Sequence, residues 1–234
     1  MKLFKLGVKT YMIVFLSVLA LFNISHMGFV VIKQTLGVVF FALILDSVII
    51  WLKEHKLKFS QSACISGLII AELLTPHQSW PIYVFAPLFA IFSKHLIKIS
   101  QRHIFNPAAF GLFLSQLFFP TGLAWWAANP VFLIIIFGLF IVYKMKRWEL
   151  ILGFLLTASL LFKGNLYLIN PYFMFFMLTE PKTQPFTKKG RIIYAGLIGI
   201  FAFLGLALIS NLDYSIFGLL LGNLSVPILN KWLK

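Results

Sequence analysis

Long apolar runs alternate with short polar segments along almost the whole chain. A helix that crosses a membrane needs about 20 apolar residues, or fewer when neighbouring protein shields it. The pattern predicts ten such segments, several of them short enough to be half-helices or tilted spans. The predicted spans are Thr10–Ile24, Thr35–Leu52, Ser62–Thr75, Pro81–Ile97, Phe105–Phe119, Val131–Tyr143, Glu149–Phe162, Tyr167–Leu178, Ile192–Ser210 and Tyr214–Leu229.

The composition agrees with a chain that lies in a lipid bilayer. Hydrophobic residues make up 61% of the chain and charged residues only 11%, and the mean hydropathy is +0.96. Soluble domains carry about 25% charged residues. We therefore expect an all-α polytopic membrane protein that forms a single domain over residues 1–234. The one cysteine, Cys64, excludes an intramolecular disulfide and a cysteine-based metal or iron–sulfur site built by this chain alone.

The basic residues lie in short clusters between the apolar runs. If the ten spans alternate from a cytoplasmic N-terminus, 18 of the 20 Lys and Arg residues lie inside, and only Lys33 and Lys163 lie outside. This distribution predicts that both ends of the chain are cytoplasmic. The net charge of +14 follows this topology, so we do not expect nucleic-acid binding. Merging the third and fourth spans into one re-entrant hairpin would give an eight-span alternative. Trp80, Trp125 and Trp126 are expected to form an interfacial belt.

An internal repeat relates the two halves of the chain. Phe110–Pro120 and Phe217–Pro227 are identical at six of eleven aligned positions, and Glu72–Phe92 resembles Phe176–Phe203. Five spans in each half is an odd number, so the second half must enter the membrane from the opposite side. We expect two inverted repeats, at about residues 10–120 and 131–230, with a site at the bilayer midplane. The shared Phe-Gly-Leu segments are expected to pack between the halves.

Three segments are expected to interrupt the regular helix pattern near this site. One of them is Asn170–Pro185, which has Asn170-Pro171 inside a span and Thr179-Glu180-Pro181 at the end of that span. Asn106 is a good N-cap, and Pro107 after it suits the first position of a helix. Ser66 and Gly67 lie inside a short span that leads to Thr75 and a proline. Irregular backbone at membrane depth is tolerated where it lines a cavity, and free N–H groups at a helix start favour an anion or a ligand's electron-rich edge. We therefore predict ligand contacts at Ser66, Gly67, Asn106 and Pro107.

Acidic residues within the apolar runs predict a second kind of site. Burying a charge in a membrane costs at least about 2.5–3.5 kcal/mol on insertion scales, so such residues usually face a cavity or a partner. Glu72 either handles an ion or proton, or lies near the outer interface and reaches water. Asp46 is expected to pair with Lys56 or Lys58, and Asn170 either caps a helix beside a loop or lines a pathway. The residues predicted for an ion or solute pathway are Asp46, Glu72, Thr75, Asn170, Thr179 and Glu180.

Three of these segments also carry a resemblance to a known family. The stretches SGLIIAELLTP, RHIFNPAAFG and FFMLTEPKTQPFTKKGRIIYAGLIG resemble the RnfD/NqrB family of membrane subunits. RnfD belongs to the Rnf electron-transport complex, and NqrB belongs to the sodium-pumping NADH–quinone reductase. The resemblance extends from about Asp46 to the C-terminus. It implies a urea-transporter-like fold, a place in the bacterial inner membrane, other membrane subunits as partners, and coupling of electron transfer to Na⁺ or H⁺ movement.

The sequence departs from this family at the flavin attachment site. Members of the family carry FMN on the threonine of an SGAT-like motif that follows the NPFNPA-like stretch. Here the corresponding region is PTGLAWWAANP, in which Thr121 is the one threonine. The resemblance therefore implies FMN or riboflavin held without a covalent bond, and covalent FMN is not supported.

Three functions remain open from the sequence. The first is a non-catalytic membrane subunit of an electron-transfer complex. The second is a transporter or channel for a small solute, with a urea-transporter-like fold and no redox role. The third is a scaffold embedded in lipid. No Ser–His–Asp, zinc or P-loop arrangement occurs in the sequence, so we do not expect catalysis by this chain alone.

Overall fold

The computed structural model describes residues 6–209 and 211–233, and nearly all of its regular structure is helical. The α-helices in these ranges are α1 (Val8–Met27), α2 (Val30–Glu54), α3 (Gln61–Leu73), α4 (Trp80–Leu96), α5 (Pro107–Phe118), α6 (Val131–Met145), α7 (Trp148–Leu161), α8 (Lys188–Leu208) and α9 (Tyr214–Trp232). The shorter elements are β1 (Lys98–Ile99), β2 (Arg102–His103), η2 (Trp126–Ala128), η3 (Leu166–Leu168) and η4 (Phe173–Met177). The two short strands pair antiparallel as a hairpin between α4 and α5.

Nine of the predicted spans coincide with an α-helix, and the eighth does not. Where a span over Tyr167–Leu178 was predicted, the chain forms the single turn η3 and the five-residue π-helix η4. Asn170 lies between these two elements and caps the second one. Its side-chain oxygen accepts hydrogen bonds from the N–H groups of Tyr172 (2.9 Å) and Phe173 (3.4 Å). This segment is therefore a short, broken helix, too short to cross a bilayer as a helix on its own. The predicted end of the ninth span at Ser210 lies outside the described residues, as do Lys2, Lys5 and Lys234 of the charge count.

Three helices are long and apolar enough to cross a membrane by length and composition: α1, α2 and α8. The protein surface around them is apolar, as shown by Leu36, Phe40 and Leu156, which are all more than half exposed. Polar side chains such as Gln34 and Asn223 are instead buried. An apolar exterior with polar side chains buried inside is the arrangement expected of a multi-pass membrane protein, because lipid replaces water as the solvent.

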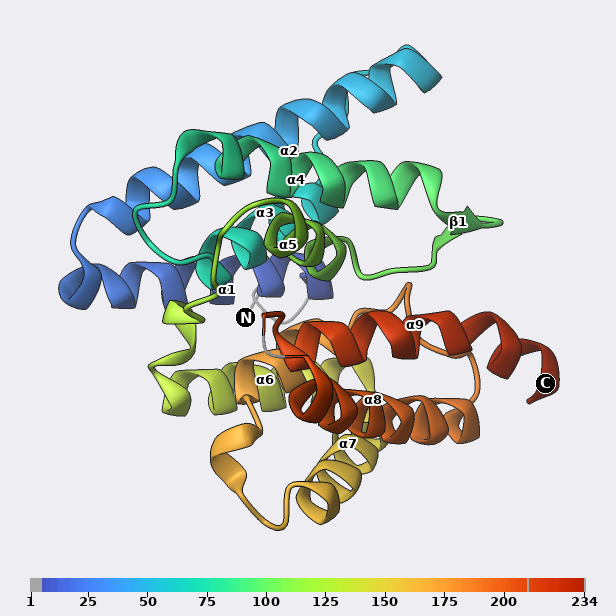
Figure 1. Ribbon diagram of the computed structural model, residues 1–234. Coiled ribbons are helices and arrows are strands. Elements are labelled where there is room, and N and C mark those ends of the chain that lie inside the picture. Colours follow the sequence, from blue (N-terminus) through green and yellow to red (C-terminus); the bar gives the residue numbers. More distant parts are fainter. Residues whose placement is uncertain (1–5, 210, 234) are drawn as a thin grey trace.

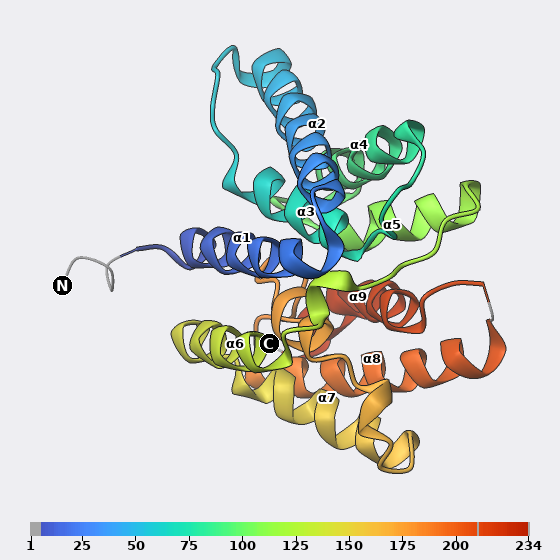
Figure 2. The ribbon, with the colours of Figure 1, turned by 90° about the vertical axis from the view of Figure 1, so that its left-hand side faces the viewer.

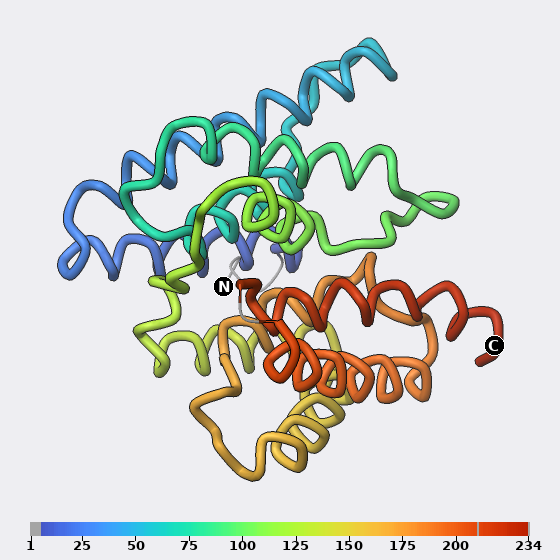
Figure 3. The backbone as a smooth tube through the Cα atoms, viewed as in Figure 1, coloured from blue at the N-terminus to red at the C-terminus, as the bar shows by residue number. Residues whose placement is uncertain are grey.

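The helices form two groups that meet along the middle of the molecule (Figure 1 and Figure 2). In the first group α4 packs on both α2 and α5, and α3 packs on α2. In the second group α8 packs on both α7 and α9. The tube view shows the chain leaving α5, passing through η2 and entering α6 in the second group (Figure 3). The groups touch through α1 with α6, and through α5 with α9.

The glycines of the repeated Phe-Gly-Leu segments pack within each group, while α5 and α9, the helices that carry these segments, also contact each other between the groups as expected. A Cβ atom added at Gly111 of α5 would overlap the backbone oxygen of Ala86 in α4. A Cβ atom at Gly218 of α9 would lie 2.7 Å from the backbone nitrogen of Ala202 in α8. Each glycine thus allows the last helix of its group to approach the preceding helix closely.

The tryptophan belt is also only partly as predicted. Trp80 is 74% exposed, as expected of an interfacial residue. Trp126 is buried instead, and its indole N–H donates to the backbone oxygen of Ala71 at 2.9 Å. Trp125 donates to Asp213 at 2.8 Å. These two rings fasten the loop after α5 to α3 and to the start of α9, a contact between distant segments that residue type alone does not predict.

Candidate functional site

A cavity of about 220 Å³ lies where α1, α3 and α5 approach the turn that follows η4. Four of the residues predicted as site residues line it: Ser66, Asn106, Thr179 and Glu180. Most of the remaining lining is apolar and includes Met12, Ile69 and Phe176. A mainly apolar cavity with a few convergent polar groups is the usual form of a ligand site. We call it the central cavity.

Asn106 shapes one wall of the central cavity, and its predicted role as a helix cap is confirmed. Its side-chain oxygen accepts a hydrogen bond from the N–H of Ala109 at 3.0 Å, and Pro107 occupies the first position of α5. Its side-chain amide donates to the backbone oxygen of Met177 at 3.2 Å, and its backbone N–H donates to the side chain of Asn223 at 3.0 Å. Asn106 therefore ties the start of α5 to η4 and α9 of the second group.

Asn223 extends this network deeper into the second group. Its side-chain amide donates to the hydroxyl of Tyr194 at 2.7 Å and to the backbone oxygen of Thr183 at 3.2 Å. Asn223 and Tyr194 are both fully buried. Each polar atom in such a network loses its water partner on burial and must find a partner within the protein instead. The network therefore favours one arrangement of α8, α9 and the turn before α8.

His103 and Glu180 form a pair at the mouth of the central cavity. The ring Nε2 of His103 lies 2.8 Å from Oε1 of Glu180, while Oε2 of the same carboxyl is buried with no partner among residues 6–209 and 211–233. Next to them, Arg102 donates to the backbone oxygens of Pro181, Lys182 and Gln184. Burial lowers the pKa of the Arg102 guanidinium from its ordinary value, and the nearby charge of Arg147 acts in the same direction. Through its hydrogen bonds to these three backbone oxygens, Arg102 holds the turn that carries Glu180 against β2.

Glu72 lies elsewhere in the interior, in contact with η4 rather than with the central cavity. The hydroxyl of Tyr172 lies 2.5 Å from Oε2 of Glu72, and both residues are fully buried. Oε1 of Glu72 has no protein partner in the described part of the chain. An unpaired buried carboxylate is strongly unfavourable, so this oxygen needs a proton or a cation. The alternative that Glu72 reaches water at the outer interface is wrong, because the side chain is buried.

The remaining predicted pathway residues are not brought together. Thr75 donates its hydroxyl to the backbone oxygen of Gly122 at 2.9 Å and so fastens the loop after α3. The hydroxyl of Thr179 donates to the backbone oxygen of Phe175 at 2.6 Å. Asn170 caps the start of the η4 segment, which is the first of the two roles weighed for it.

Asp46 does not pair with Lys56 or Lys58 as predicted. Its buried carboxyl accepts from Lys94 at 2.8 and 2.9 Å and lies 2.6 Å from Nε2 of His95. The reason is geometric, since α2 packs on α4 and presents Asp46 to the end of that helix, whereas Lys56 and Lys58 follow the end of α2 in an exposed loop. Asp46 is therefore a structural ion-pair residue.

Ser66 and Gly67 belong to a regular helix, which corrects the expectation of irregular backbone there. α3 is continuous from Gln61 to Leu73, and the hydroxyl of Ser66 donates to the backbone oxygen of Ser62 at 3.0 Å. A Cβ atom at Gly67 would lie 2.9 Å from Cα of Val39, so Gly67 allows α3 to pack on α2. Ser66 lines the central cavity, but Gly67 and Pro107 do not line it.

The sequence reasoning missed three residues of the interior: His103, Tyr172 and Asn223. Asn223 carried a detectable signal, because it is a single amide within the apolar run of α9. Tyr172 follows Asn170-Pro171 directly and could have been recognised as a polar group on a broken helix. No group of three or more His, Cys, Asp or Glu that could hold a metal ion occurs in residues 6–209 and 211–233.

Comparison with known proteins identifies the family. The model of the NQR2, RnfD, RnfE family matches residues 6–132 and 128–234. A similar protein is the D subunit of the ion-translocating oxidoreductase complex of Actinobacillus pleuropneumoniae serotype 5b, 32% identical over 124 residues, which are 46% of this chain and 35% of that protein. The corresponding protein of Salmonella paratyphi B is 30% identical over 130 residues, or 49% of this chain and 36% of that protein. The matched part is thus about a third of these relatives' length. Since the family model covers the described chain from end to end, the chain belongs to the NQR2, RnfD, RnfE family.

Proposed function

We propose that this chain is a membrane subunit of an Rnf- or Nqr-type electron-transport complex and helps Na⁺ or H⁺ to cross the membrane. The observation that carries the proposal is the buried Glu72–Tyr172 pair, in which one carboxyl oxygen has no partner among the residues that the structure describes. The pair joins α3 to the η4 segment of the other group of helices, where a transported ion would meet both halves. Family membership and the names of the relatives, which are subunits of ion-translocating oxidoreductase complexes, support this role.

Neither Thr121 nor the central cavity alone suits a flavin. Thr121 is buried, and its hydroxyl donates to the neighbouring backbone oxygen of Gly122 at 3.3 Å, so it does not suit covalent attachment of FMN. The central cavity, at about 220 Å³, is smaller than the roughly 300–1,000 Å³ of most small-molecule sites. The central cavity by itself is therefore too small for a flavin, and no step of the proposed function passes through one. Non-covalent FMN or riboflavin stays a prediction from the family.

One preparation tests the function against the solute-channel alternative. The tagged chain, extracted mildly from native membranes, should migrate on a native gel in a complex much larger than its own 26.7 kDa, with flavin or iron–sulfur absorbance. After denaturing electrophoresis, the band of this chain should show no flavin fluorescence, because we expect no flavin to be covalently attached to it. If the chain migrates alone, is colourless and makes liposomes permeable to urea, the proposed function is wrong and the channel alternative is correct.

We also propose ten membrane segments in two inverted halves, with the η4 segment as the broken eighth and both ends in the cytoplasm of a bacterial cell. The contacts in the two groups support this arrangement. In the first group α4 contacts α2 and α5, and in the second α8 contacts α7 and α9 in the same way. Gly111 approaches α4 and Gly218 approaches α8 with equivalent closeness. In a Cys64→Ser background, Lys163→Cys should react with a membrane-impermeant maleimide added outside spheroplasts, and Lys189→Cys should not. Labelling of Lys189→Cys from outside would contradict this topology.

A further inference from the structure

A second hollow, of about 470 Å³, opens beside the central cavity and is strongly basic. It shares Lys9, Ser62, His103 and Lys182 with the lining of that cavity. We call it the basic vestibule. Its lysines come from α1, α2, the loop after α2, α4, β1 and the turn after η4; they are Lys9, Lys53, Lys58, Lys94, Lys98 and Lys182.

The positive charge of the basic vestibule is not balanced by the protein. Lys94 is neutralised by the buried carboxyl of Asp46 behind it. The other five lysines share the hollow with one acidic residue, Glu54. Within the described part of the chain, no carboxylate lies within ion-pair distance of Lys58, Lys98 or Lys182. An anion bound here would relieve the repulsion among these like charges.

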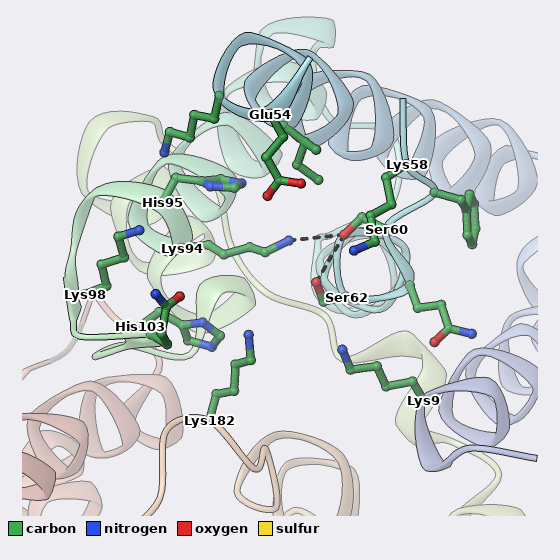
Figure 4. A pocket seen from close by; sticks show the side chains of 15 residues that line it. Lys9, Glu54, Lys58, Ser60, Ser62, Lys94, His95, Lys98, His103 and Lys182 are labelled. Carbon is green, nitrogen blue, oxygen red and sulfur yellow. Dashed lines mark hydrogen bonds between the residues drawn. The ribbon is translucent and has the colours of Figure 1, made fainter. Parts of the chain in front are cut away.

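The geometry of the vestibule also suits an anion. Figure 4 shows Lys9, Lys58, Lys94 and Lys182 entering from different sides, with the ammonium groups of Lys94 and Lys182 directed into the shared space. Ser60, the N-cap of the 13-residue helix α3, lies in the wall, and Lys94 donates to its hydroxyl at 3.2 Å. The start of a helix adds partial positive charge and free N–H groups.

Membrane topology alone does not account for this arrangement. The bias of Lys and Arg toward cytoplasmic loops requires only that such residues lie near the ends of spans. It does not require that lysines from six separate segments converge on one concave space. Basic pockets between membrane helices recognise the phosphate groups of anionic lipids, and lysine binds phosphate as a point charge.

We propose that the basic vestibule binds a phosphate-bearing anion. Two sources have this chemistry: the headgroup of an anionic phospholipid and a soluble phosphate compound. Both would place phosphate oxygens among Lys58, Lys98 and Lys182. The proposal uses none of the residues assigned to ion passage, so it stands independently of the proposed function.

The experiment compares two triple variants of the full chain that lose the same charge. Lys58→Gln/Lys98→Gln/Lys182→Gln removes three lysines of the vestibule, and all three side chains are exposed, so folding is preserved. The matched control removes three lysines elsewhere: Lys163→Gln/Lys188→Gln/Lys231→Gln. Inorganic pyrophosphate is titrated into the detergent-solubilised protein by calorimetry. Separately, thermal unfolding is measured in nanodiscs of phosphatidylglycerol and of phosphatidylcholine.

We expect the original chain to bind at least one probe, and the vestibule variant to bind at least about tenfold more weakly, since even one lost charge-assisted contact is worth about a tenfold change or more. The control should bind as the original chain does. Calorimetric binding of pyrophosphate identifies a soluble anion, and stabilisation by phosphatidylglycerol alone identifies a lipid headgroup. Equal loss in the two variants, or no response to either probe, overturns the proposal.

Discussion

Replacing Gly111 or Gly218 with alanine is expected to destabilise the protein, although alanine is normally the better helix former. The added Cβ at Gly111 would overlap the backbone oxygen of Ala86, and the one at Gly218 would lie 2.7 Å from the backbone nitrogen of Ala202. Backbone atoms inside helices cannot move aside as side chains do. Overpacking of this kind costs about 1–3 kcal/mol, which exceeds the roughly 1 kcal/mol that alanine gains over glycine in a helix. The thermal unfolding midpoint in detergent should fall by several degrees in each variant.

Gly37→Ala provides the matched control for both variants. Gly37 also lies within a membrane helix, α2, but a Cβ atom there would meet no atom within 4 Å. This variant should unfold at the same temperature as the original chain or slightly higher. Unchanged unfolding of both Gly111→Ala and Gly218→Ala would mean that α5 and α9 do not approach their neighbours this closely. The close helix contacts at Gly111 and Gly218 would then no longer support the proposal of two inverted halves.

The local features of the fold were predictable because they depend on neighbouring residues. Asn106 followed by Pro107 specifies the start of α5, since the cap uses an N–H three residues further along the same chain. The apolar runs specify nine of the helices, since each needs only an uninterrupted stretch of apolar side chains. The eighth run was expected to be short and interrupted at Asn170-Pro171, and the structure has this interruption directly before η4.

The long-range features of the site were not predictable from the residues near them in sequence. Asp46 was paired with Lys56 or Lys58, which are close to it along the chain, whereas the packing of α2 on α4 brings it to Lys94, which is 48 positions away. Tyr172 reaches Glu72 across 100 positions. The sequence identifies which polar groups are costly to bury, but only the packing of helices determines which partner each receives. The predicted site thus contained Glu72 and Glu180 without Tyr172 and His103.

Replacing Glu72 with glutamine is expected to abolish most of the cation movement that accompanies electron transfer. Glutamine has nearly the same shape and can still accept a hydrogen bond from Tyr172, so the fold should survive. It cannot carry a proton or a negative charge, which is the property that the unpartnered carboxyl oxygen supplies. In native membrane vesicles, uptake of Na⁺ or H⁺ per electron transferred should fall by about a hundredfold, the lower range for loss of a positioned proton-transfer group.

Tyr172→Phe separates the two possible roles of this pair. It removes the 2.5 Å hydrogen bond but keeps the ionisable carboxyl. In either role Tyr172→Phe should be the less stable variant, because it leaves the carboxyl without a partner. If Glu72 carries the ion, Tyr172→Phe should still retain much more cation uptake than Glu72→Gln. If the pair is only a structural clamp, the two variants should differ in stability and not in uptake. In that case Glu72→Gln should leave coupled uptake unchanged, a result that would remove Glu72 from the ion pathway.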